Sequence, residues 1–117
     1  MPIALARHLA VLIAVLAAVP ARAGDAPYVG TWALNVANCT AAQDSQDAPL
    51  VIAKDRYDQH EVHCTFKSVT GKDGDYKVAG DCTVEGNAQS YDFMLTVSGD
   101  TLTVTDEAGA RDFLRCK

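Results

Sequence analysis

The sequence has few basic residues. Lysine and arginine together number 10, against 15 aspartate and glutamate residues, so the formal net charge is -5. A nucleic-acid-binding surface needs clustered lysine and arginine to neutralise phosphates, and here the basic residues are scattered. We therefore expect no nucleic-acid partner, and we expect the acidity to serve solubility or steering towards a basic partner.

Motifs of common catalytic and metal sites are also missing. No serine stands in a Gly-x-Ser-x-Gly context, and no glycine-rich phosphate loop occurs. His60 and His63 lack the His-Glu-x-x-His spacing of helical zinc sites, and no Cys-x-x-Cys pair offers a thiolate site. The sequence therefore predicts no enzyme activity, no metal and no cofactor.

Long hydrophobic runs are missing apart from one near the N-terminus. The eleven-residue run Leu9–Val19 follows two basic residues and is about half the ~20 residues that a membrane-spanning helix needs. Ala21-Arg22-Ala23 then has the small-x-small pattern that a signal peptidase recognises. We expect residues 1–23 to be a cleavable signal peptide and residues 24–117 to form a single exported domain with no membrane anchor.

The expected mature chain is small and more acidic than the full sequence. Removing residues 1–23 takes away Arg7 and Arg22 and no acidic residue, so the net charge goes from -5 to -7. A domain of this size has a marginal core, and each disulfide would contribute ~2 to 4 kcal/mol. We expect two disulfides and a periplasmic or secreted location, because every cysteine lies in this part: Cys39, Cys64, Cys82 and Cys116.

Apolar and polar residues alternate over most of the mature chain, which is typical of half-buried strands. Apolar residues fall on one face of residues 62–68 and again on one face of residues 76–84, with a turn signal at Gly71–Gly74 between them. The pattern predicts a hairpin there. Further strands are expected at residues 31–36, 50–54, 91–97, 102–104 and 111–116, with a polar connection at 40–47. Short antiparallel strands at this spacing indicate a sandwich or a barrel.

The two ends of the mature chain favour a barrel. Gly30-Thr31-Trp32 opens the first expected strand and Arg115 lies in the last. This layout resembles the calycin superfamily of lipocalins, avidins and small bacterial barrel inhibitors of proteases and lysozymes. The resemblance implies an all-β fold, a small antiparallel barrel of about seven to eight strands, with Trp32 at the closed end beneath Arg115. It carries over the structural signature Gly30, Trp32 and Arg115, but no binding site.

Because the strands are short, side chains are expected to fill the barrel. The residues that compete for the interior are Trp32, Leu34, Phe66, Tyr76, Tyr91, Phe93 and Leu95. A filled barrel favours a non-enzymatic binding protein that uses an outer surface, such as an inhibitor of a secreted or periplasmic hydrolase. The alternative is a miniature lipocalin-like carrier of a small apolar ligand. For an inhibitor, we expect contacts from Gly24–Tyr28, predicted to leave the barrel free, and from the connection Thr40–Asp47.

Four cysteines allow three pairings, and sequence alone does not decide between them. A hairpin centred on Gly71–Gly74 would place Cys64 beside Cys82, so that bond is possible. It would leave Cys39 to reach Cys116 across the length of a closing strand, and a seven-residue strand spans ~23 Å whereas a disulfide tolerates a Cα separation of ~6 Å. We therefore favour Cys39 with Cys64 and Cys82 with Cys116.

Overall fold

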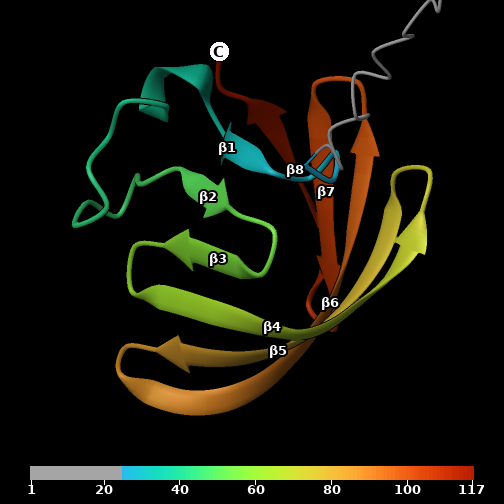
Figure 1. Ribbon diagram of the computed structural model, residues 1–117. Coiled ribbons are helices and arrows are strands. Elements are labelled where there is room, and N and C mark those ends of the chain that lie inside the picture. The colour runs from blue at the N-terminus through green and yellow to red at the C-terminus, as the bar shows by residue number, and fades with distance from the viewer. Residues whose placement is uncertain (1–24) are drawn as a thin grey trace, which may run out of the picture.

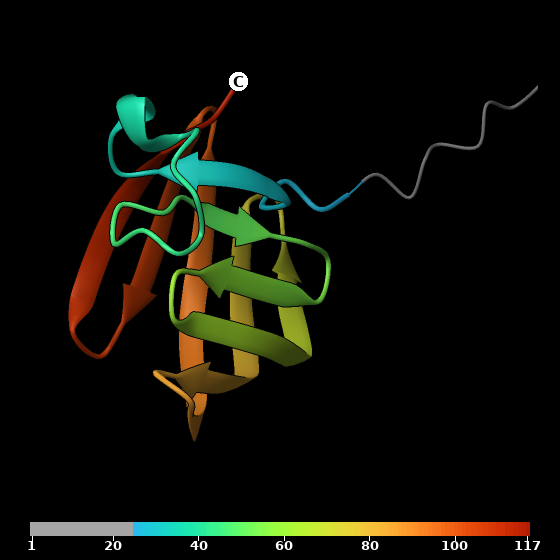
Figure 2. The same cartoon turned by 90° about the vertical axis from the view of Figure 1, so that its left-hand side faces the viewer.

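The computed structural model describes residues 25–117, so the expected signal peptide lies outside the described residues. Within them, eight strands form a closed antiparallel barrel in chain order (Figures 1 and 2). The strands are β1 (Gly30–Ala33), β2 (Leu50–Ile52), β3 (Arg56–Gln59), β4 (Val62–Lys72), β5 (Asp75–Val84), β6 (Asn87–Ser98), β7 (Thr101–Asp106) and β8 (Gly109–Arg115), and the 3-10 turn η1 (Val36–Asn38) follows β1. The expected all-β barrel is confirmed.

The barrel consists of two crossing layers joined by long, curved strands. Figure 2 shows β1 to β4 side by side and β6 to β8 running across them. The predicted hairpin is β4 and β5, closed by Asp73-Gly74, whose φ angles of 57° and 92° suit a tight hairpin turn. A bulge between Phe66 and Ser68 shifts the register and places Cys64 opposite Cys82. The hairpin predicted from the alternation is therefore confirmed.

Side chains fill the barrel, as expected. Of the residues predicted inside, Trp32, Phe93 and Leu95 are buried, while Phe66, Tyr76 and Tyr91 are partly buried against the core. Leu34 was predicted inside and is 60% exposed. The prediction was wrong because β1 ends at Ala33 rather than Val36, and the chain then turns into η1.

Arg115 lies over Trp32 at the closed end of the barrel, as predicted. The Trp32 indole is buried and donates from Nε1 to the Tyr28 carbonyl over 2.9 Å. The Arg115 guanidinium carbon lies 4.1 Å from the centre of the Trp32 ring. A Cβ at Gly30 would stand 3.3 Å from the Arg115 Nη1, so glycine leaves room for this approach.

The segment before β1 is part of the closed end and does not leave the barrel free. Tyr28 is 3% exposed, and its hydroxyl donates to the Lys54 carbonyl over 3.1 Å. The Pro27 carbonyl accepts a hydrogen bond from Arg115 over 3.2 Å. The expectation of a free segment up to Tyr28 is therefore wrong at these residues.

The disulfides join Cys39 to Cys116 and Cys64 to Cys82, so the favoured pairing was wrong. The error lay in the assumed length of the closing strand. β1 has four residues, and η1 folds the chain back, which brings the Cys39 Cα to 5.6 Å from that of Cys116. Two disulfides in a small barrel are compatible with an extracellular location.

Candidate functional site

The end of the barrel away from Trp32 is called the mouth below. It holds the β3–β4, β5–β6 and β7–β8 turns, each two residues long. A small cavity of about 160 Å³ enters the barrel here. Its walls are Tyr57, Gln59, Val62, Cys82, Val84, Gln89, Tyr91 and Arg111.

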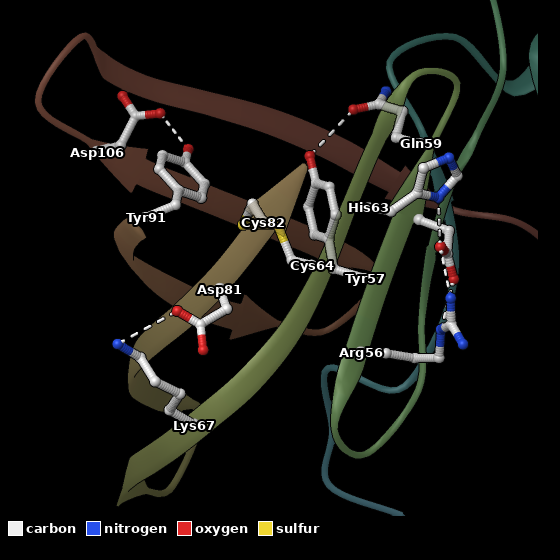
Figure 3. The surroundings of a disulfide bond; sticks show 11 residues. Arg56, Tyr57, Gln59, His63, Cys64, Lys67, Asp81, Cys82, Tyr91 and Asp106 are labelled. Atoms are coloured by element: carbon white, nitrogen blue, oxygen red, sulfur yellow. Dashed lines mark hydrogen bonds and ion pairs between the residues drawn. A yellow bond between two sulfur atoms is a disulfide. The ribbon is translucent and has the colours of Figure 1, made fainter. Parts of the chain in front are cut away.

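Figure 3 shows two hydrogen-bonded pairs of polar side chains at the mouth, one on each side of the Cys64–Cys82 disulfide. The Tyr91 hydroxyl of β6 donates to Asp106 at the end of β7, and Arg111 of β8 lies 3.9 Å from the same carboxylate. On the facing wall, the Tyr57 hydroxyl donates to the Gln59 Oε1 over 3.1 Å. The Cys64–Cys82 disulfide ties β4 to β5 between these two groups.

Three side chains of the mouth, Tyr57, Tyr91 and Asp106, have pKa values shifted by their surroundings. Burial raises the pKa of Tyr57, and burial together with the Asp106 carboxylate raises the pKa of Tyr91. The hydrogen bond from Tyr91 lowers the pKa of Asp106, helped by the amide of Ala108. These shifts move all three groups away from the range in which a side chain exchanges protons at neutral pH.

An acidic groove of about 380 Å³ lies beside the mouth. Gln89–Asp92 of β6 form one wall, and Asp106–Ala108 of the β7–β8 turn form the other. A second hollow of about 240 Å³ continues past Asp92 and Glu107 towards Lys77 and Met94. Asp92 and Glu107 line both hollows, and neither forms a salt bridge within residues 25–117.

One wall of the groove is an open strand edge. The ladder between β6 and β7 runs from Ser98 opposite Thr101 only as far as Met94 opposite Thr105. Residues 87–93 continue β6 and pair with β5 alone. Beyond Met94, β6 and β7 are linked by the side-chain hydrogen bond between Tyr91 and Asp106 and by no main-chain ladder.

The histidines do not form a shared site. His63 Nδ1 lies 2.7 Å from the Asp58 Oδ1, and Asp58 also accepts from Arg56, which lowers the pKa of that carboxyl. His60 instead binds Gln43 of the 40–47 connection, with its amide donating to the Gln43 Oε1 over 2.9 Å. In the described chain, no group of three or more His, Cys, Asp or Glu residues is arranged to hold a metal ion.

Comparisons with protein-family models, curated proteins and solved structures find no match to this chain. In residues 25–117, no helix is long and apolar enough to cross a membrane. The groove and the open edge were not predicted from the sequence. Alternation identifies β6 as a strand, but whether each part of a strand has a partner depends on how far its neighbours extend.

Proposed function

We propose that this chain is an exported, non-enzymatic protein that binds another protein, with inhibition of a secreted or periplasmic hydrolase as the specific role. The supporting observation is the contrast between the core of the barrel and its surface. The interior is filled, with Trp32, Leu50, Leu95 and Leu102 at 0% exposure, while a charged groove beside an open strand edge lies on the surface.

The mouth cavity argues against carriage of a lipid-sized ligand. Binding sites for drug-sized molecules are typically ~300 to 1,000 Å³ and mostly apolar. The cavity here is about 160 Å³, and Tyr57, Gln59 and Arg111 place polar atoms in its walls. A long apolar ligand would have to displace core residues such as Phe93, which would expose a close-packed interior.

The chemistry at the mouth supports a binding role over catalysis. A general acid or base works best with a pKa near the working pH, and the shifts of Tyr57, Tyr91 and Asp106 all lead away from neutrality. The four cysteines are consumed in disulfides, so none is a free nucleophile. The disulfides also fit the export expected from residues 1–23.

Native mass spectrometry of the protein purified gently from the exported fraction of its own host tests the proposal. We expect a stoichiometric complex with a second protein, and loss of that protein's hydrolytic activity in the complex. An added mass of a few hundred daltons on the lone chain would instead support the carrier alternative. A chain that is recovered free and inhibits none of the secreted hydrolases of its host would refute the proposal.

A further inference from the structure

The open edge of β6 has main-chain groups that point away from the barrel. The two-residue turn Glu85-Gly86 makes Val84 and Asn87 the closing pair of the β5–β6 hairpin. From there every second residue of β6 bonds to β5, and the Val97 amide still donates to the Gly74 carbonyl at the far end of the strand. The intervening residues Ala88, Ser90 and Asp92 therefore direct their N–H and C=O groups to the other side.

On that other side, β7 takes up only part of the edge. Met94, Thr96 and Ser98 lie within the β6–β7 ladder, opposite Thr105, Thr103 and Thr101. Ala88, Ser90 and Asp92 lie beyond it, and all three residues are exposed. An exposed edge with unpaired main-chain groups is a template onto which another strand can be added.

The acidic groove beside this edge favours a partner segment with positively charged side chains. Asp92 stands at the edge itself, and Glu107 stands on the opposite wall. A second copy of this chain that paired edge to edge would bring the same carboxylates together, which disfavours self-association. An extended segment with lysine or arginine side chains would instead meet both carboxylates while its main chain bonded to β6.

We infer that the β6 edge at Ala88, Ser90 and Asp92 binds an extended basic segment of a partner protein by strand addition, with Asp92 and Glu107 contacting its cationic side chains. This inference rests on the proposed function, because it names the surface and the kind of partner segment. The main-chain hydrogen bonds would supply affinity, and the carboxylates would supply the preference for a basic sequence.

The test uses the isotope-labelled chain and a defined probe, an acetylated and amidated heptapeptide in which lysine alternates with threonine. We expect the amide signals of Ala88, Ser90 and Asp92 to shift and their hydrogen exchange to slow. The same peptide methylated on alternate main-chain nitrogens should bind about tenfold more weakly, because it cannot complete the ladder. A glutamate-for-lysine peptide should give no response.

Two variants of the chain locate the contact. Ser90→Pro removes an N–H that points to the open edge and leaves the hydrogen bonds to β5 in place, so we expect about tenfold weaker binding. Ser90→Thr keeps the N–H and is the matched control. For charge, Asp92→Asn with Glu107→Gln should weaken binding and reduce its salt dependence, whereas Asp73→Asn in the distant β4–β5 turn should leave both unchanged.

Three results would overturn the inference. One is the absence of shifts at these amides with millimolar peptide. Another is equal binding of the methylated peptide, which remains decisive if Ser90→Pro fails to fold. The third is concentration-dependent broadening of the edge amides without peptide, which would assign the edge to a second copy. If a native complex is recovered and Ser90→Pro leaves it intact, the assignment of the β6 edge as the binding surface is wrong, while the proposed function stands. If the peptide binds the β6 edge but no native complex exists, the proposed function fails, while the assignment of the edge as a peptide-binding surface stands.

Discussion

Removing the Cys39–Cys116 disulfide should cost this barrel a large share of its stability. The seam that closes the barrel is short, since β1 pairs with β8 at only two positions, Trp32 with Arg115 and Ala33 with Leu114. The disulfide lies directly beside that seam, where the Cys116 amide donates to the Thr31 carbonyl over 2.8 Å. It therefore holds together two strands that few hydrogen bonds join.

The magnitude follows from the separation of the two cysteines. They are 77 residues apart, and closing a loop of that length in the unfolded chain corresponds to about 4.5 kcal/mol at 25 °C in the chain-entropy account. Both side chains are only half buried, so truncation adds little loss of packing. For Cys39→Ala with Cys116→Ala we expect unfolding to be about 3 to 4.5 kcal/mol easier, a large part of the ~5 to 15 kcal/mol of a typical domain.

Urea unfolding followed by Trp32 fluorescence measures this loss. With an m-value of about 1.5 kcal/mol/M, the midpoint should fall by about 2 to 3 M. Lys117→Gln is the matched control, because it removes a surface ion pair with Asp100 next to the disulfide and should change stability by less than ~0.5 kcal/mol. A loss below ~1 kcal/mol in the cysteine variant would refute the argument, as would a Cys39–Cys64 linked peptide in digests of the oxidised protein.

Three further perturbations test other parts of the structure. Arg115→Gln removes the cation above Trp32 and should destabilise the protein by about 1 to 2 kcal/mol in thermal unfolding, with a change in Trp32 emission; unchanged emission would contradict the stacking. Tyr91→Phe removes the donor that lowers the pKa of Asp106. The intact protein has this stabilisation above the usual carboxyl pKa of 3.8 and loses it as the pH falls below that value. The variant should therefore be less stable at pH 7, and its stability should fall less steeply in acid. Parallel profiles of stability against pH for the two proteins would count against the contact. Gly74→Ala places a Cβ 2.7 Å from the Val97 carbonyl oxygen at a φ of 92°. Chemical unfolding should show a free energy of unfolding lower by more than ~1 kcal/mol. An unchanged free energy of unfolding would exclude this turn geometry.

The fold could be predicted from the sequence because its main signals are local. Alternation in β4, β5 and β6 gives the strands, the Asp73-Gly74 turn gives the hairpin, and the spacing of Trp32 and Arg115 indicates closure. β3 was missed because Tyr57 is its single buried residue, so no alternation is visible. The chain reversal at η1 also left no pattern, and the disulfide pairing was wrong as a result.

The candidate site was harder to predict because it depends on where strands stop. Asp106 and Tyr91 are 15 positions apart and meet only because the ladder between β6 and β7 ends before them. Nothing in the composition of residues 87–92 marks their outer edge as unpaired. Such features follow from the relative lengths of neighbouring strands, which depend on the closure of the whole barrel.

The covalent ring closed by Cys39 and Cys116 bears on how the protein would survive proteolysis. Every turn that joins consecutive strands from β2 to β8, including the one at Glu85-Gly86, lies inside this ring. A single cut at any of these turns opens the ring but leaves the two pieces joined through Cys39 and Cys116. The nicked chain keeps its parts at high effective concentration, so the barrel can persist after an attack that would release fragments from an uncrosslinked protein.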